Sequence, residues 1–131
     1  MLTLAIESRP NTSIAVHRGP LHYAFDISRN QTLLVQNTEQ PLAVDLQFLP
    51  TEEWQYAIDV STLTFHNNPP PSGQLPTPIF DAGLPPYTIT VLACPIQWNL
   101  AGSNFVTSPP VDPTCTGGAK NVTLWPYGVR E

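Results

Sequence analysis

Proline is the residue that most constrains how this chain can fold. Sixteen of its 131 residues are proline, more than twice the usual share of about 5%. A proline inside a helix removes a backbone hydrogen bond and collides with the preceding turn. Because prolines interrupt nearly every window long enough for a helix, the chain is expected to fold without long helices.

Between the prolines, apolar residues recur at every second position, which predicts strands with one buried face. The alternation is clear in four segments: Leu21 to Ile27, Leu42 to Phe48, Tyr56 to Val60 and Tyr87 to Ala93. Shorter candidates are Leu2 to Glu7, Ser13 to His17, Thr32 to Gln36, Leu63 to His66 and Asn121 to Trp125. Short strands separated by turn residues are typical of an antiparallel sandwich or barrel. We expect an all-β, jelly-roll-like antiparallel β-sandwich.

The length predicts a single domain over residues 1–131, or a fragment of one. Two segments are too rich in proline or glycine for core strands. Residues 67–86 carry seven prolines, and residues 103–119 carry three prolines and a Gly-Gly pair. Both are expected to be long surface loops, the first in extended polyproline geometry.

The charge balance excludes two classes of partner. Five Lys and Arg stand against ten Asp and Glu, a net charge of -5. Five scattered basic residues do not form the cationic stripe that nucleic acid binding needs. No apolar run approaches the length of about 20 residues that a membrane span requires. We therefore expect neither a nucleic acid nor a membrane as partner.

Cysteines and glycosylation motifs indicate a secreted protein. A disulfide between Cys94 and Cys115 is favoured, with two inert thiols as the alternative. Asn-x-Ser/Thr motifs make Asn11, Asn30 and Asn121 candidate N-glycosylation sites. Low charge with abundant Thr, Ser, Asn and Pro fits the same compartment. Residues 1–10 show no signal peptide, so a secreted protein would carry its signal elsewhere on a longer parent chain.

No set of residues forms a recognisable catalytic, cofactor or metal site, and we assign none. His17 and His22 would point to opposite faces of a continuous strand, and His66 is remote in sequence. The adjacent Glu52 and Glu53 make a poor acid/base pair. The strand carboxylates are interpreted as solvated: Asp26, Asp45 and Asp59.

Four aromatic residues stand at or near the ends of the expected strands: Trp54, Trp98, Trp125 and Tyr127. Rings at such positions fill the core, seal its ends, stack on sugars or face a partner domain. We keep these readings open, with an exposed apolar patch for a partner as the leading one.

Four phrases, spread over nearly the whole chain, carry a resemblance to a known family. They are residues 6–24 with Gly19-Pro20-Leu21, residues 53–58, residues 87–98 with the following Ser108-Pro109-Pro110, and residues 122–128. In this order and spacing they resemble the β-L-arabinofuranosidase-like glycoside hydrolases (family 127 type, six-hairpin glycosidase-like). The matching portion is the C-terminal β-sandwich of these enzymes.

The resemblance implies where catalysis occurs in the parent enzyme. In that family an (α/α)6 barrel holds a cysteine nucleophile beside a zinc ion with Glu and Cys ligands. Neither a Glu-x-Cys motif nor a Cys-Cys pair occurs here, so no zinc or other cofactor is expected in this chain. The chain also ends at Gly128 to Glu131, where family members continue, which suggests a fragment.

The resemblance therefore predicts a non-catalytic accessory module of a secreted glycoside hydrolase, packed against a catalytic barrel absent from this chain. The parent enzyme would hydrolyse L-arabinofuranosyl or related plant-type glycans. The alternatives are a free-standing carbohydrate-binding or cell-surface interaction module, and an orphan fragment without activity.

Overall fold

The computed structural model describes residues 2–70, 72–74, 85–102 and 105–127. Within these residues every regular element is a strand, and all strand pairs are antiparallel. The predicted all-β, antiparallel class is confirmed. The strands are β1 (Leu4–Ser8), β2 (Ile14–Arg18), β3 (Leu21–Phe25), β4 (Arg29–Gln36), β5 (Val44–Pro50), β6 (Tyr56–Asn67), β7 (Tyr87–Pro95), β8 (Leu100–Ala101), β9 (Phe105–Val106) and β10 (Lys120–Pro126).

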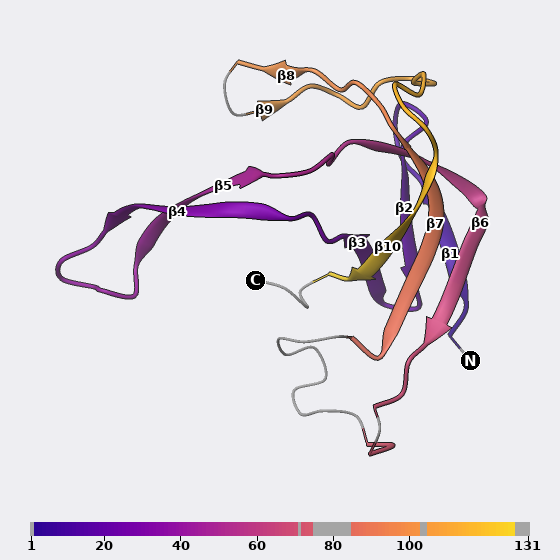
Figure 1. Cartoon of the computed structure of the whole chain (residues 1–131), viewed down its shortest axis with the longest axis horizontal. Helices are drawn as coiled ribbons and strands as arrows, with labels where there is room; N and C mark the ends of the chain where they lie inside the picture. The colour runs from indigo at the N-terminus through magenta and orange to yellow at the C-terminus, as the bar shows by residue number, and fades with distance from the viewer. Residues whose placement is uncertain (1, 71, 75–84, 103–104, 128–131) are drawn as a thin grey trace.

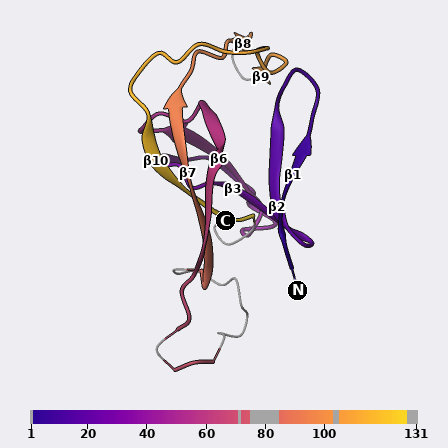
Figure 2. The ribbon, with the colours of Figure 1, turned by 90° about the vertical axis from the view of Figure 1, so that its right-hand side faces the viewer.

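Six strands form one curved sheet in the order β1-β2-β3-β10-β7-β6 (Figures 1 and 2). Strand β10, the last strand of the described residues, lies between β3 and β7. Its Leu124 is opposite Phe25 on one side and Ile89 on the other. The C-terminal segment therefore closes the middle of the sheet rather than its edge.

The remaining strands form two separate hairpins, β4–β5 and β8–β9. Both project from the same side of the curved sheet (Figure 1). A jelly-roll-like sandwich needs a second sheet packed face to face on the first. Because the other strands form these hairpins instead, the sandwich itself stays a prediction.

The core follows the predicted alternation. In β7, Ile89 and Val91 are fully buried, and the intervening Thr90 is half-buried. Val16, Tyr23 and Leu124 bring β2, β3 and β10 to the same cluster. One apolar face of the large sheet thus forms the hydrophobic core.

Gly19 forms the tight turn between β2 and β3. Its φ is +57°, a conformation that side chains disfavour, and a Cβ there would collide with Leu2. The turn makes His17 and His22 direct cross-strand partners, with ring centroids 5.5 Å apart. Opposite faces would apply only to a continuous strand, and the turn predicted at Arg18-Gly19-Pro20 folds one strand back on the other, so the two rings lie on the same face.

Two predicted strands, Tyr56 to Val60 and Leu63 to His66, are one continuous strand, β6. Its register with β7 shifts between Asp59 and Thr64. At this irregularity the Thr62 hydroxyl oxygen accepts the Leu92 N–H at 2.8 Å. A side chain thus supplies an acceptor for a backbone donor of the neighbouring strand.

A disulfide joins Cys94 to Cys115, with Cα atoms 5.6 Å apart. It ties the segment after β7 back to the sheet, where Ile96 also pairs with Cys115. The expected loop at 103–119 contains one short strand, β9, which we had not predicted. Most of the proline-rich segment 67–86 lies outside the described residues.

Candidate functional site

The described residues expose more large apolar side chains than they bury. Seventeen are exposed, whereas eight apolar residues are buried. Monomeric soluble proteins rarely expose large contiguous apolar patches, and such patches mark interaction sites. About half of the exposed residues belong to the β4–β5 hairpin, which we call the arm (residues 29–50).

The arm is exposed along its whole length and extends far from the large sheet (Figure 1). Its tip is nevertheless ordered by hydrogen bonds. The Asn37 side-chain oxygen accepts the N–H groups of Glu39 and Gln40, each at 2.9 Å. Leu42, next to this turn, is 98% exposed. The arm therefore presents an apolar residue at its far end.

The strand register gives the arm one apolar face. Leu33 is opposite Leu46, so the two side chains lie on the same face. Val44 and Phe48 share it, because alternate residues of a strand point the same way. The opposite face carries the polar pair Thr32 and Gln47. We call Leu33, Val44, Leu46 and Phe48 the apolar face of the arm.

Our expectation that the strand Leu42 to Phe48 has a buried face was wrong. The alternation is present, but all residues of β5 are exposed. A two-stranded ribbon has no second layer of its own to cover an apolar face. The alternation predicted the strand correctly, but it does not identify the surface that would cover the apolar face of the strand.

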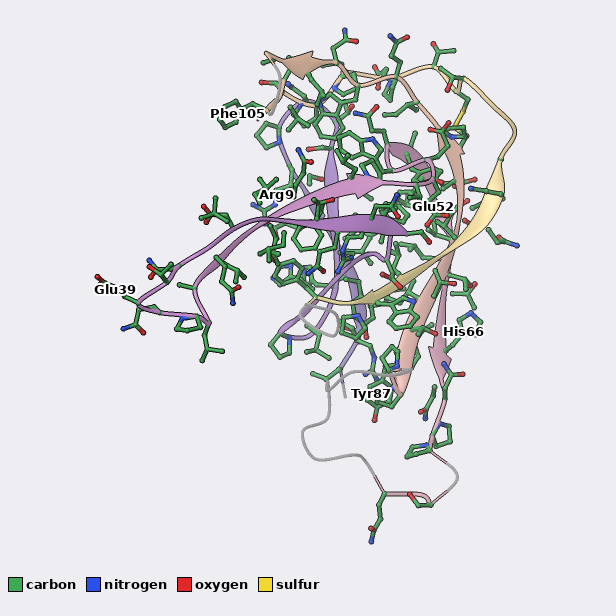
Figure 3. All side chains as sticks on the ribbon, turned by 60° about the vertical axis from the view of Figure 1, so that its left-hand side comes forward. Arg9, Glu39, Glu52, His66, Tyr87 and Phe105 are labelled. Atoms are coloured by element: carbon green, nitrogen blue, oxygen red, sulfur yellow. A yellow bond between two sulfur atoms is a disulfide. The ribbon has the colours of Figure 1, made fainter. Side chains whose placement is uncertain are left out.

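An open groove of about 670 Å³ lies between the base of the arm and the β8–β9 hairpin. It is lined by Phe25, Ile27, Arg29, Gln47, Phe48, Leu49, Pro50, Trp54, Leu100, Phe105 and Val106. Phe105, near the end of the hairpin (Figure 3), is 75% exposed. The Arg29 guanidinium lies 5.2 Å from the centroid of the Phe48 ring. We call this feature the arm–hairpin groove.

The four rings selected from the sequence have different environments. Trp54 is 39% exposed and lines the arm–hairpin groove, whereas Tyr127 follows β10 and is 82% exposed. Trp98 and Trp125 are half-buried, and the Trp98 indole N–H donates to the Thr107 carbonyl at 2.9 Å. The structure therefore brings only one of the four to the groove. Apart from Arg29, Gln47 and Pro50, the other groove residues are aliphatic or phenylalanine. The sequence had placed Phe25 and Phe48 on strands and Phe105 in a loop, and none of them at a site.

Two carboxylates and one His side chain make hydrogen bonds that hold the local structure. Glu52 accepts the Ser28 N–H at 2.7 Å, which holds the pKa of this carboxyl below its usual value. Asp59 accepts hydrogen bonds from the Ser61 hydroxyl and N–H, which also lower the pKa of its carboxyl. His66 lies 2.7 Å from the Thr90 hydroxyl.

The pKa of Lys120 shifts in the opposite direction. A hydrogen bond with Tyr56 raises the pKa of the Lys120 ammonium.

In the part of the chain that the structure describes, no three His, Cys, Asp or Glu residues are grouped closely enough to hold a metal ion. None of its segments is a helix long and apolar enough to cross a membrane.

The three candidate glycosylation sites, Asn11, Asn30 and Asn121, are exposed. Asn30 is on the arm, opposite Leu49 in the register. It therefore lies on the face away from Phe48. A glycan at Asn30 would leave the apolar face of the arm uncovered.

No family model, no curated protein and no solved structure matches the chain.

Proposed function

We propose that this chain is a non-catalytic β-domain that docks onto a larger domain through the apolar face of the arm and the arm–hairpin groove. The observation that carries the proposal is the extended hairpin with exposed Leu33, Leu46 and Phe48 on a single face. An isolated two-stranded hairpin is marginally stable in water. A partner that covers the apolar face would stabilise the arm and remove these side chains from water.

The energy available from such docking is substantial. Fully burying one Leu, Val or Phe side chain stabilises by about 1.5 to 3 kcal/mol relative to leaving it exposed. Interfaces between domains of one protein typically bury about 600 to 1,500 Å². An apolar face of four large residues, next to a groove that adds Trp54 and Phe105, offers the chemistry of such an interface.

The partner in this proposal is a catalytic (α/α)6 barrel of a secreted glycoside hydrolase that resembles the β-L-arabinofuranosidases. This step rests on the sequence resemblance at residues 6–24, 53–58, 87–98 and 122–128. The zinc and the catalytic residues belong to that barrel, and the β-domain shapes or covers its active site. The substrates would be L-arabinofuranosyl or related plant-type glycans.

The test is co-expression of the chain with such a barrel from the same source, followed by size-exclusion chromatography with light scattering. A one-to-one complex is expected for the native chain. Phe48→Asp should abolish co-elution, because it places a charge on the apolar face, whereas Thr32→Asp on the opposite face should not. A chain that stays monomeric, with no barrel bound, contradicts the proposal.

A second test concerns catalysis. The purified chain is expected to show no hydrolysis of an aryl arabinofuranoside. Turnover that disappears on substitution of a single Asp or Glu of this chain would contradict a non-catalytic role.

One observation favours a second candidate, the free-standing carbohydrate-binding or interaction module. Trp98 lies outside the arm–hairpin groove and lines a separate cleft.

A further inference from the structure

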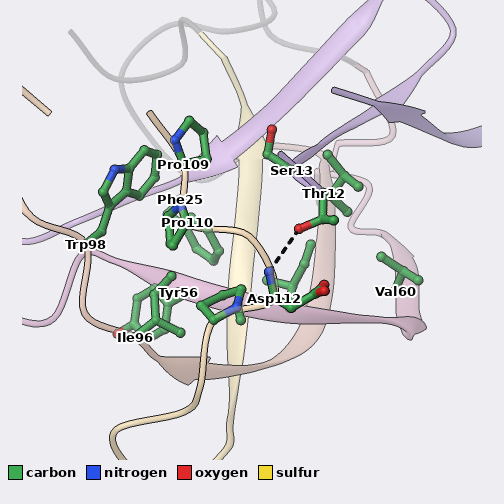
Figure 4. A pocket seen from close by; sticks show the side chains of 14 residues that line it. Thr12, Ser13, Phe25, Tyr56, Val60, Ile96, Trp98, Pro109, Pro110 and Asp112 are labelled. Atoms are coloured by element: carbon green, nitrogen blue, oxygen red, sulfur yellow. Dashed lines mark hydrogen bonds between the residues drawn. The ribbon is translucent and has the colours of Figure 1, made fainter. Parts of the chain in front are cut away.

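A second cleft, with a volume of about 850 Å³, opens between the sheet and two loops (Figure 4). Its size is within the range of small-molecule sites, about 300 to 1,000 Å³. The lining residues are Thr12, Ser13, Ile14, Phe25, Tyr56, Ala57, Ile58, Val60, Ile96, Trp98, Pro109, Pro110, Asp112 and Pro113. Apolar and aromatic side chains predominate, and polar groups are limited to a few at the rim.

Trp98 is held in place from two directions. The Gln55 side chain accepts the Trp98 N–H at 3.1 Å and donates to the Trp98 carbonyl at 2.6 Å. The indole N–H is fixed on the Thr107 carbonyl. With backbone and ring both anchored, Trp98 presents a half-buried aromatic surface at a fixed position beside the cleft.

Two loops meet across the rim and form what we call the clasp. The Asn11 side-chain amide donates to the Pro109 carbonyl at 3.1 Å. The Asp112 N–H donates to the Thr12 hydroxyl oxygen at 3.3 Å, drawn as a dashed line in Figure 4. These bonds join the turn after β1 to the loop before the disulfide.

The clasp contains all the left-handed non-glycine residues of the described chain. The φ angles are 59° at Asn11, 60° at Thr12 and 46° at Asp112. Asn and Asp tolerate this conformation, whereas a β-branched Thr is a genuine outlier. Strained backbone persists where the surrounding structure enforces it, and it clusters at ligand-binding and active sites.

The loop that carries Asp112 is also anchored covalently. It ends at Cys115, which is bonded to Cys94 and paired with Ile96 of the cleft wall. An anchored rim loses little conformational entropy when a ligand binds, which favours affinity.

We propose that the clasped cleft is a binding site for a neutral saccharide of one or two rings. Such a ligand has an apolar C–H face and hydroxyl groups at its edge. The Trp98 ring and the apolar wall match the face, and the rim matches the hydroxyls.

The rim offers both hydrogen-bond donors and acceptors. Among the described residues the Asp112 carboxylate has no hydrogen-bond partner, so it is available as an acceptor. The Thr12 hydroxyl accepts the Asp112 N–H and retains its own proton to donate. The Ser13 hydroxyl donates to Pro10 at 2.7 Å and retains lone pairs. The Asp112 charge disfavours an anionic ligand, which is why the proposal specifies a neutral one.

The site is independent of the docking proposal, although Phe25 borders both the cleft and the arm–hairpin groove. The two ideas therefore fail separately. Phe48→Asp should leave saccharide binding unchanged, and Trp98→Ala should leave the apolar face of the arm intact.

The experiment is an NMR titration of the full chain with a panel of neutral pentose and hexose disaccharides. A saturable shift of the Trp98 indole N–H signal is expected with at least one of them. Asp112→Asn tolerates the left-handed backbone but removes the charge, and it should weaken binding by about fivefold or more. Trp98→Ala should weaken it by about tenfold. Trp54→Ala, a ring outside the cleft, is the matched control and should bind like the native chain.

Three outcomes would overturn the proposal. The first is the absence of any saturable shift across the panel. The second is undiminished binding by a folded Asp112→Asn chain, whose substitution is at the surface and does not threaten folding. The third is binding of a neutral apolar dye such as Nile red in the cleft without binding of any saccharide.

Discussion

The side-chain amide of Asn11 donates a hydrogen bond to the carbonyl oxygen of Pro109, a residue 98 positions further along the chain. The bond connects the turn of the β1–β2 hairpin, at one end of the sheet order, to the loop closed by the disulfide. The bond closes the rim of the cleft at a residue whose φ is 59°, in the left-handed region.

Two substitutions at Asn11 separate the hydrogen bond from the backbone strain. Asn11→Gly loses the bond but accepts the positive φ, so a loss of about 0.5 to 1 kcal/mol in the free energy of unfolding is expected. Asn11→Ala loses the bond and also pays the left-handed penalty of about 1 to 2 kcal/mol. Urea denaturation should therefore rank native above glycine above alanine. An alanine variant as stable as the glycine variant would contradict the left-handed geometry.

Tyr23→Phe is expected to stabilise the protein. Tyr23 is 8% exposed, and its buried hydroxyl has no hydrogen-bond partner among the residues that the structure describes. Removing an unsatisfied buried polar group should raise the free energy of unfolding by about 1 kcal/mol. Tyr127→Phe, at an exposed position, should change stability little. A destabilising effect of Tyr23→Phe would show that the Tyr23 hydroxyl has a hydrogen-bond partner in the folded protein.

The same substitution should alter the response to alkaline pH. Burial raises the pKa of the Tyr23 hydroxyl above its usual 10.0. Below pH 10.0 the group is neutral in both states. As the pH rises from there through the folded pKa, the unfolded chain ionises first and stability falls. Thermal unfolding of Tyr23→Phe between pH 9 and 11 should lack this part of the loss. If the thermal stability of the two proteins fell in parallel with pH, burial would not raise the pKa of the Tyr23 hydroxyl.

Replacing both cysteines by serine should weaken the fold. The bond closes a loop with a sequence separation of 21, for which loop-closure entropy gives about 3 kcal/mol. The double variant should unfold at a lower urea concentration than the oxidised chain and match the reduced native chain. Equal unfolding free energies with and without the bond would show that it constrains neither state.

Glycosylation at Asn30 should spare the apolar face of the arm. After expression through a secretory pathway, mass spectrometry should find glycans at Asn30 and Asn121, which are exposed, and less at Asn11, whose amide nitrogen donates to Pro109. Asn30 faces away from Phe48 but is opposite Leu49, which lines the arm–hairpin groove, so enzymatic removal of its glycan should strengthen association with a barrel without being required for it. Association that appears only after deglycosylation would place the interface on the other face.

The sequence predicted most strands but not their burial. Ile89 and Val91 alternate with polar residues in the same way as Leu46 and Phe48, yet the first pair is fully buried and the second exposed. The alternation of apolar and polar residues predicts a strand and indicates which of its faces is apolar. Which strands join the large sheet is decided by long-range pairing, here by β10 between β3 and β7.

The cleft and the second hairpin were not predictable for different reasons. Strands of two residues, as in β8 and β9, leave no periodic signal. The clasp depends on tertiary contacts between Asn11 or Thr12 and residues about 100 positions away. The cysteine pairing was favoured from the sequence because closing the loop between Cys94 and Cys115 would stabilise the fold.

Hydrogen–deuterium exchange would show whether the arm docks onto a barrel. The chain would be measured alone and with an (α/α)6 barrel of the β-L-arabinofuranosidase-like kind. In the free chain, amides of the exposed arm should exchange faster than those of β7, whose side chains pack in the core. With the barrel present, protection should appear at residues 29–50, 100–102 and 105–106, and it should be absent in Phe48→Asp. Unchanged exchange in the arm, or protection confined to other strands, would contradict the account.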